Sequence, residues 1–428
     1  MALMALVVLG LFALAIWAHN RPYKRLQDAR ALVADARAIA AFNIASVRLT
    51  TVDRLALRAI PNRRLVEAFG IDNSFTTTDT KHHTDFLTQA TQKIQSVDSR
   101  GWARLFDVAQ GAMGLAEAHV RSESPGAGSQ IPLARLVRIS TFITVLNILF
   151  GVKPGDIAIQ DIVTATDLIN TLWVLSKDCS NKSLLAMDKQ RLRMTLDYML
   201  RTLGEPGGDE RRFNPLNLII PAYETLWRVV LLTFLAAAFR TSDPDTVRWF
   251  RDVMHSVPSC LERDRGSTRE GDAEKIALAF AKWDPRTANN TQEGLRLYPP
   301  TKRIYRGPPP DGPQRRAWRA DIERCHRDPA IWGTDALRFD PLRFFSLTED
   351  QKHAYMPFSV RPHECPAERG GFGERAIVLL VVVLARRLGT RESGLLVRFN
   401  DAVLDGDDAD MPLPNARDAA ERWVVVER

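Results

Sequence analysis

The pattern of apolar and polar positions changes along the chain from long helical periodicity to short alternating runs. Apolar residues recur every three or four positions over several long segments, which predicts helices separated by Gly-, Pro- and Ser-rich turns. These predicted helices cover residues 83–96, 101–121, 131–150, 159–177 and 184–203. Beyond Gly394, short pieces such as LLVRF and WVVVE lie between polar turns and predict strands. The expected fold is mainly α with small β sheets.

Three further segments are less regular. Residues 216–239 are apolar almost throughout, but Glu224 and Arg228 lie near the centre, where isolated charges are costly in lipid. Because these two residues are four apart, they can pair along one helix face, and we expect a buried central helix rather than a membrane span. The apolar run at 376–385 is too short to span a bilayer. Residues 41–57 mix β-branched residues with polar breaks and fit either a strand or a helix.

The N-terminus has the pattern of a membrane anchor. Residues 2–18 carry no charge, and as a helix they span roughly 25 Å, enough for a bilayer core. Basic residues follow between Arg21 and Arg30, so the positive-inside rule places the rest of the chain in the cytosol. A cleaved signal peptide is the alternative, but no basic residue precedes the apolar run. We expect an anchor over residues 1–20 and one catalytic domain over residues 21–428.

Composition excludes some classes of protein. The chain has 428 residues, 45% of them hydrophobic and 25% charged, as in ordinary globular proteins. The net charge of +7 suits an anionic membrane or an acidic partner, but no aromatic–basic platform accompanies it, and nucleic-acid binding is not expected. The cysteines form no CxxC pair, which argues against a disulfide framework or structural zinc. Those cysteines are Cys179, Cys260, Cys325 and Cys365.

Glu293 and Arg296, in TQEGLRLYPP, give the first chemical signal. They are three residues apart, which places them on one helix face, and Pro299 and Pro300 end that helix. Taken alone, such a pair is usually an ordinary surface ion pair.

Two later segments make this pair more informative. The segment HRDPAIWGTDALRFDPLRF places Arg343 on an irregular, Pro-bounded stretch. The segment PFSVRPHECPA places Cys365 in a Pro-flanked loop before an apolar helix. A lone cysteine is more often inert than a ligand, but the positive end of a helix dipole and free backbone N–H groups stabilise a thiolate at a helix entrance.

In this order and spacing, the three segments resemble the C-terminal half of a cytochrome P450. The resemblance implies the cytochrome P450 fold, preceded here by one N-terminal transmembrane helix. It also implies that Glu293, Arg296 and Arg343 form a buried triad that locks the core on the haem side. The Cys365 thiolate would then be the axial ligand of the iron in haem b, which favours O–O cleavage.

The cysteine loop departs from the family pattern F-x-x-G-x-R-x-C-x-G. Phe358 and Cys365 match, whereas His363 stands where Arg is usual and would donate one hydrogen bond to a haem propionate. Arg361 and Ala367 replace the two glycines. Because a residue with Cβ enters the tight turn at a cost of about 1–2 kcal/mol, either the loop turns differently or Arg361 itself meets a propionate.

Two further segments resemble the family more loosely. PAYETL resembles the oxygen-activation motif, with Glu224 and Thr225 as the acid and alcohol that relay protons; the alternative is a buried Glu224 paired with Arg228. FTTTDTKHHTDFL resembles the segment that leads into a propionate-binding helix, with His82 or His83 at the binding position. The expected Arg four residues later is absent.

The resemblance implies a monooxygenase that inserts one oxygen atom from O₂ into a small apolar substrate. Electrons would come from NADPH through a cytochrome P450 reductase, at the endoplasmic reticulum membrane. The segments YETLWR, EGLRLYPP and HECPA are similar to those of fungal family members that act in secondary metabolism. Two alternatives stay open: a haem-thiolate isomerase or dehydratase that needs no reductase, and a degenerate haem-binding scaffold. Positions near 297–305 would line the substrate pocket, or form a turn and strand beneath it.

Overall fold

The computed structural model describes most of the chain. The described ranges are residues 49–97, 99–123, 130–177, 182–201, 214–266, 285–306, 318–406 and 411–426. The predicted anchor over residues 1–20 lies outside them and stays a prediction.

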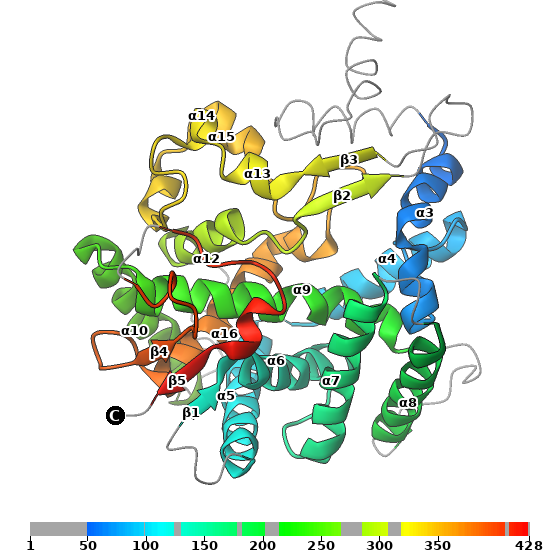
Figure 1. The fold of residues 1–428 in the computed structure, drawn as a ribbon, viewed down its shortest axis with the longest axis horizontal. Helices are drawn as coiled ribbons and strands as arrows, with labels where there is room; N and C mark the ends of the chain where they lie inside the picture. The colour runs from blue at the N-terminus through cyan, green and yellow to red at the C-terminus, as the bar shows by residue number, and fades with distance from the viewer. Residues whose placement is uncertain are drawn as a thin grey trace, which may run out of the picture.

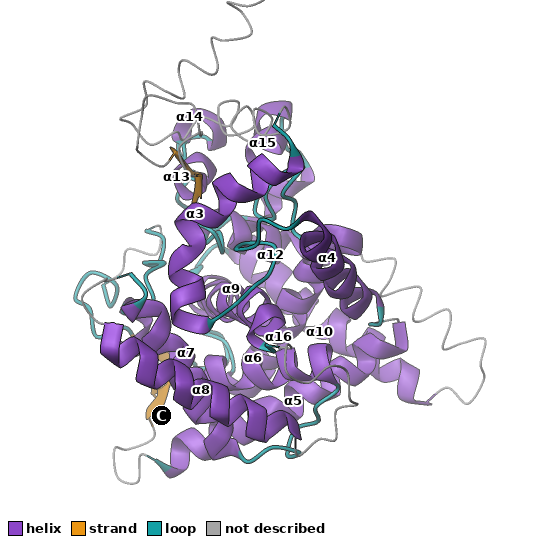
Figure 2. Ribbon diagram, turned by 90° about the vertical axis from the view of Figure 1, so that its right-hand side faces the viewer, coloured by secondary structure: helices purple, strands orange, loops and turns teal. Residues whose placement is uncertain are grey.

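Helices form most of the described structure, and the five long predicted helices are confirmed to within a few residues (Figures 1 and 2). Residues 41–57 were compatible with a strand or a helix. The part of this segment from Thr51 onward forms the start of a helix. The described α-helices are α3 (Thr51–Phe69), α4 (Thr80–Gln95), α5 (Ser99–Ser122), α6 (Leu133–Phe150), α7 (Ile159–Leu175), α8 (Lys182–Arg201), α9 (Leu216–Leu235), α10 (Pro244–Gly266), α12 (Pro285–Leu297), α13 (Ile322–His326), α14 (Pro329–Trp332), α15 (Glu349–Ala354) and α16 (Phe372–Leu388).

Short elements complete the architecture. A π-helix, η2 (Ala236–Arg240), extends α9, and three 3₁₀ helices are η3 (Pro341–Phe345), η4 (Pro366–Gly371) and η5 (Ala419–Arg422). The strands are β1 (Gln130–Pro132), β2 (Arg303–Arg306), β3 (Trp318–Asp321), β4 (Leu396–Arg398) and β5 (Val424–Val426). They form two small antiparallel sheets, β1-β5-β4 and β2-β3. The predicted C-terminal strands are confirmed, and residues 303–306 form a strand.

Helix α9 runs through the middle of the molecule, and the other elements lie around it (Figure 1). Helix α12 and the β2-β3 hairpin lie on one side, and α5 to α7 lie on the other. Helices α6, α12 and α16 contact α9 directly. Both α6 and α9 with η2 are long and apolar enough to cross a membrane, but most of their residues are buried inside the protein. The prediction of a buried central helix is therefore confirmed.

Pro221 lies inside α9 and has no N–H to donate to the carbonyl of Asn217. That carbonyl accepts a hydrogen bond from the Asn73 side chain instead, at 3.0 Å. A contact from outside the helix thus satisfies the group that the proline leaves unpaired.

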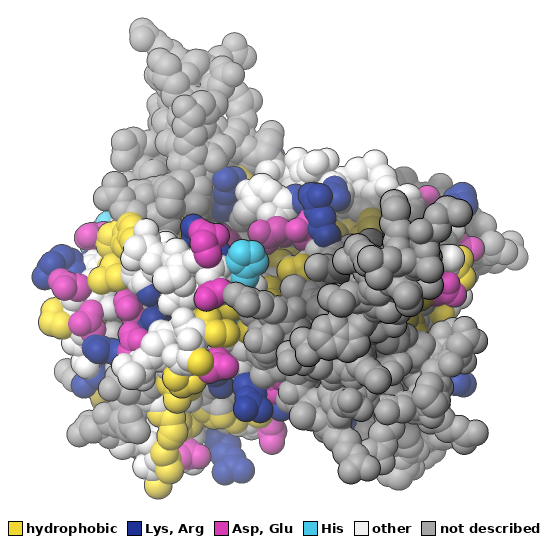
Figure 3. Space-filling view, turned by 90° about the horizontal axis from the view of Figure 1, so that it is seen from above, with side chains coloured by type: hydrophobic (Ala, Val, Ile, Leu, Met, Phe, Trp, Pro, Cys, Tyr) yellow, Lys and Arg dark blue, Asp and Glu magenta, His cyan; other side chains and the backbone are white. Residues whose placement is uncertain are grey.

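The surface seen from above carries mixed charges (Figure 3). Lys and Arg side chains alternate with Asp and Glu over the described part of this face, without a large patch of one sign.

A buried ion-pair network holds α12 to the segment that leads toward Cys365. The Arg296 side chain is fully buried, and its Nε and Nη2 donate to the two oxygens of Glu293, each at 2.7 Å. Its Nη1 donates to the carbonyls of His326 and Ala336, each at 2.7 Å. Arg343, on η3, donates to the same Glu293 carboxylate at 3.2 Å. The structure therefore brings together the three residues that the resemblance grouped.

A glycine sets the distance between α12 and α9. A Cβ at Gly294 would lie 2.8 Å from Cγ2 of Thr233, closer than real side chains approach. Thr233 is itself fully buried in α9 and has no room to move. The ion-pair network on α12 thus depends on a glycine one residue after Glu293.

We expect Gly294→Ala to lower the free energy of unfolding by about 1–3 kcal/mol, because the added methyl group overpacks the α9–α12 contact. The matched control is Gly114→Ala on α5, where a Cβ meets nothing within 4 Å. That variant should gain about 0.5–1 kcal/mol, since alanine favours helix. Urea unfolding followed by circular dichroism compares the two; equal effects would contradict the close approach of the helices.

We expect Arg296→Met to lose about 3–5 kcal/mol of stability, because it leaves the buried Glu293 carboxylate short of a partner. Adding Glu293→Gln removes the uncompensated charge, so the double variant should unfold at a higher urea concentration than Arg296→Met alone. A double variant less stable than the single one would show that the charges themselves are not the main cost.

Candidate functional site

The loop before Cys365 is closed by hydrogen bonds between its own backbone groups. The N–H of Cys365 donates to the carbonyl of Phe358 at 2.9 Å, and the N–H of His363 donates to Val360 at 3.1 Å. Cys365 is exposed at the end of this loop. The loop therefore presents one sulfur atom from a backbone whose shape is set locally.

The turn in this loop falls at Ser359, not at Arg361. Ser359 has a positive φ of 66°, and among the described non-glycine residues only Asn400 shares that sign. The first of the two sequence alternatives therefore holds: the loop turns differently from the family pattern. The Arg361 side chain is 90% exposed and lies 3.8 Å from Glu364. A cofactor contact through Arg361 stays a prediction that this position does not favour.

Phe358 anchors the loop against the start of α16. A Cβ at Gly373 would lie 2.7 Å from Cε1 of the Phe358 ring, so only glycine lets the ring lie this close to the helix. Phe358 also packs against the main hydrophobic core. Gly373 is therefore a positioning residue that the sequence analysis missed, although it stands in the glycine-rich run before the apolar helix.

Nearby groups shift the pKa of the Cys365 thiol in opposite directions. Desolvation by crowded protein atoms raises the pKa of Cys365, whereas the N–H of Ala367 and the positive charge of Arg58 lower it. The apolar helix predicted after the cysteine loop is confirmed, but it begins seven residues beyond Cys365. Cys365 precedes the short η4, and α16 begins only at Phe372. The nearby N–H of Ala367 and Arg58, rather than the α16 dipole, are therefore what favour the thiolate.

Basic and imidazole side chains gather near the thiol from four separate elements. Burial, followed by Arg58 and Arg306, lowers the pKa of His363 to about 2. Burial and Arg58 also lower the pKa of His83. Burial lowers the pKa of Arg58 to about 9 and that of Arg306 to about 10. All four pKa values are lowered chiefly because burial disfavours the positively charged form of each side chain.

Several polar atoms of this cluster lack partners. Both ring nitrogens of His363 and Nδ1 of His83 are buried without a hydrogen bond. The guanidinium of Arg58 lies 4.4 Å from the centre of the Phe75 ring and forms no ion pair with the described residues. Buried polar groups are normally satisfied, so this donor set fits a ligand that brings acceptor oxygens. A prosthetic group with carboxylates beside an iron that binds sulfur meets this requirement.

The sequence analysis found part of this cluster. It named His363 and offered His82 or His83; the structure places His83 in the cluster, whereas the His82 ring contacts the carbonyl of Asp72 at 2.9 Å. Arg58 and Arg306 were missed, because neither stands in a motif and they are distant in the chain.

The other candidate residues lie on α9. The alternative in which the Glu224 carboxylate pairs with Arg228 is wrong, because that carboxylate pairs with Arg417, from the segment before η5. Arg228 instead donates to the carbonyl of Pro300 at 3.0 Å and only weakly to the backbone of Glu224, at 3.5 Å. The Thr225 hydroxyl donates to the carbonyl of Pro221 at 3.3 Å. Glu224 Oε1 is buried without a partner.

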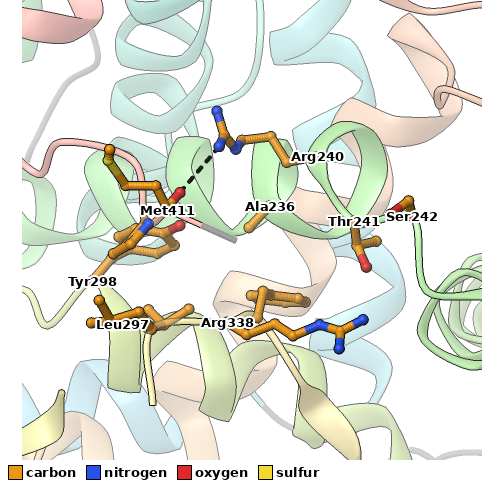
Figure 4. Close-up of a pocket in the computed structure, with 11 residues that line it drawn as sticks. Ala236, Arg240, Thr241, Ser242, Leu297, Tyr298, Arg338 and Met411 are labelled. Carbon is orange, nitrogen blue, oxygen red and sulfur yellow. Dashed lines mark hydrogen bonds between the residues drawn. The ribbon is translucent and has the colours of Figure 1, made fainter. Parts of the chain in front are cut away.

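A small cavity of about 20 Å³ lies where η2 meets the end of α12 (Figure 4). Arg240 and Tyr298 are among its lining residues, and Arg240 donates to the carbonyl of Met411 at 3.1 Å. The cavity has room for about one water molecule, and it is lined by Leu297 and Tyr298 from the stretch 297–305 but by none of the predicted catalytic or cofactor-binding residues.

Comparison with known proteins agrees with this site. The family model described as Cytochrome P450 matches residues 320–380, which include Arg343 and Cys365. Cytochrome P450 4X1 of Mus musculus is 29% identical over 46% of this chain and 38% of its own length. Taurochenodeoxycholic 6 alpha-hydroxylase of Sus scrofa is 28% identical over 40% of this chain and 36% of its own length. The chain thus spans well under half the length of these curated relatives.

A solved structure shows the fold over a larger part of the chain. A six-coordinated cytochrome P450 from Thermus thermophilus aligns with a TM-score of 0.51, at 16% identity, over 78% of this chain and 79% of its own. The chain therefore has the cytochrome P450 fold. The matched segment, the curated relatives and this fold together support the assignment of the chain to the cytochrome P450 family.

Proposed function

We propose that this protein is a haem-thiolate monooxygenase that inserts one atom of O₂ into an apolar organic substrate. The observation that carries the proposal is the pairing of two features: an exposed Cys365 on a closed loop, and a cluster of cations and unpartnered imidazoles beside it. The buried nitrogens of His363 and His83 lack acceptors among the described residues. Haem b supplies both an iron for the thiolate and carboxylates for the cluster.

The residues have distinct roles in this proposal. Cys365 would hold the haem iron through its thiolate, and haem b would supply the redox chemistry of dioxygen when it is bound. Arg58, Arg306, His363 and His83 would hold the two propionates through charge-assisted hydrogen bonds. Phe358 and Gly373 fix the position of the loop against the start of α16. Glu293, Arg296 and Arg343 hold the segment that precedes the loop.

Glu224 and Thr225, on α9, form the proton path in this proposal. Glu224 Oε2 is tied to Arg417, which leaves the unpartnered Oε1 to accept a hydrogen bond from a water molecule on the proposed proton path. The neighbouring Thr225 hydroxyl donates to a carbonyl in the same helix and can exchange that bond for one to a water or substrate. The pair thus offers a path for protons through a buried helix.

The remaining parts of the proposal rest on the sequence. Residues 1–20 would anchor the protein in the endoplasmic reticulum membrane, with the haem domain of residues 21–428 in the cytosol. An NADPH-dependent cytochrome P450 reductase would supply the electrons. The amino-acid sequences of the motifs support a fungal-type enzyme of secondary metabolism. The relative named as a hydroxylase supports the reaction class.

The proposal predicts that the full-length protein, with a reductase and NADPH, incorporates one atom of isotopically labelled dioxygen into a product from a panel of apolar compounds. Cys365→Ser should abolish incorporation. Thr225→Val should lower the product formed per NADPH, because proton delivery is impaired. Product formed without NADPH would instead indicate an isomerase or dehydratase, and a protein that never binds haem would indicate a scaffold.

Arg58→Gln should weaken haem binding about tenfold, the effect of losing about 1.4 kcal/mol from a charge-assisted hydrogen bond. Arg63→Gln is the matched control, since Arg63 lies on the same helix but is exposed and pairs with Glu67. Titration of haem into the unloaded proteins measures both. Equal affinities for the two variants would remove Arg58 from the propionate site.

A further inference from the structure

Glu374 places a carboxyl group at the point where α16 meets α12. It lies in the first turn of α16, directly after Gly373, and it is only partly exposed. Gln292 on α12 donates from its Nε2 to Oε1 of Glu374 at 3.4 Å. Gln292 is also the residue before Glu293 of the buried ion-pair network. This contact therefore joins the helix that follows the cysteine loop to the helix that supports the segment before it.

The other acidic groups near Glu374 come from both sides of Cys365. Glu368 lies on η4, which follows Cys365 directly and packs against α16. Burial raises the pKa of Glu368, and the charge of Glu364 adds to the effect. Tyr355, from the segment before the loop, has a buried hydroxyl without a hydrogen-bond partner among the described residues. Burial raises the pKa of Tyr355, and Glu374 makes the largest contribution of any charged group.

A negative charge on Glu374 is poorly compensated. Burial, followed by the repulsion of Glu368, raises the pKa of Glu374 to about 7, although the Gln292 hydrogen bond and Arg375 lower it. The first turn of a helix normally favours a carboxylate, so burial and Glu368 outweigh the helix dipole here. Near neutral pH this carboxyl group therefore exists in both its neutral and its charged form.

We propose that Glu374 is a positioning residue for Cys365, and that its neutral carboxylic acid holds the cysteine loop between α12 and α16. In this form the group keeps its contact with Gln292 and does not repel Glu368. The charged form introduces repulsion between α16 and η4, which loosens the backbone that carries the sulfur. The inference rests on the proposed function, because it takes Cys365 as the ligand of the haem iron.

The raised pKa sets the direction of the pH effect. When the loop opens, Glu374 returns to its ordinary pKa of 4.5 and releases a proton. Opening therefore becomes more favourable as the pH rises from the ordinary pKa to the raised one, and it levels off above that. With these two pKa values, linkage gives an opening equilibrium about tenfold larger at pH 8 than at pH 6.

Transfer of haem from the loaded, full-length protein to excess apomyoglobin measures this opening. We expect the wild-type protein to lose haem about tenfold faster at pH 8 than at pH 6. Glu374→Gln stays neutral and keeps the amide contact with Gln292, so its ratio of the two rates should be about tenfold smaller than that of the wild type. Glu374→Ala lacks the contact and should lose haem quickly at both pH values.

Glu392→Gln is the matched control, since Glu392 is an exposed acid beyond the other end of α16 and lies 3.9 Å from Arg251. Its ratio of rates should equal that of the wild type. A Glu374→Gln variant with the wild-type ratio would overturn the inference. So would a Glu374→Gln variant that loses haem as quickly as Glu374→Ala at pH 6, because a neutral side chain would then not support the loop.

Infrared difference spectroscopy between pH 6 and pH 8 separates this inference from the proposed function. A neutral carboxylic acid absorbs apart from a carboxylate, so the full-length wild-type protein should lose an acid band at pH 8 that Glu374→Gln lacks at both pH values. Absence of that band in the wild type would overturn the inference. An acid band in a protein without thiolate-bound haem overturns the proposed function. Thiolate-bound haem whose release does not respond to Glu374→Gln overturns the positioning role alone.

Discussion

The ion pair between Glu293 and Arg296 is the interaction on which the rest of the site depends. It is fully buried, and burying two charges is favourable only when nearly every donor and acceptor finds a partner. Here the backbone meets that need: Arg296 donates to carbonyls on both sides of α14, and Glu293 accepts from the N–H of Asp340 at 2.9 Å. A pair of charges on one helix turn thereby fixes the irregular segment that precedes the cysteine loop.

From that fixed segment the chain reaches Cys365 through a loop with its own internal hydrogen bonds. The loop needs few contacts to hold the sulfur, because Ser359 supplies the turn and Phe358 rests against Gly373. The positive charge lies beside it, in side chains from α3, α4, β2 and the loop itself. Rigid support and a cluster of basic side chains therefore occur together, which is typical of a preorganised site for an anionic cofactor.

Basic side chains form two separate groups in this molecule. The one at Arg58 lies near the thiol, and the one at Arg417 surrounds the acid on α9. Helix α3 contributes to both, through Arg58 and Arg64. The burial that lowers the pKa values of these arginines also strengthens any ion pair that they form.

The sequence predicted the parts of the structure that depend on local patterns. The long helices and the buried position of α9 follow from periodicity, and the grouping of Glu293, Arg296 and Arg343 follows from the family resemblance. The partner of Glu224 could not be predicted, because Arg228 was the nearest basic residue in sequence and Arg417 reaches Glu224 only through the fold. The same reason hid Arg58 and Arg306, because basic side chains from distant elements come together only in the fold.

The carbon monoxide difference spectrum of the reduced, full-length protein tests the central claim most directly, because the Soret band of the ferrous complex reports the ligand opposite carbon monoxide. The account predicts the long-wavelength band characteristic of thiolate ligation, and its loss in Cys365→Ser. A wild-type protein that shows only the shorter-wavelength band, or a Cys365→Ser variant that keeps the thiolate band, would contradict it.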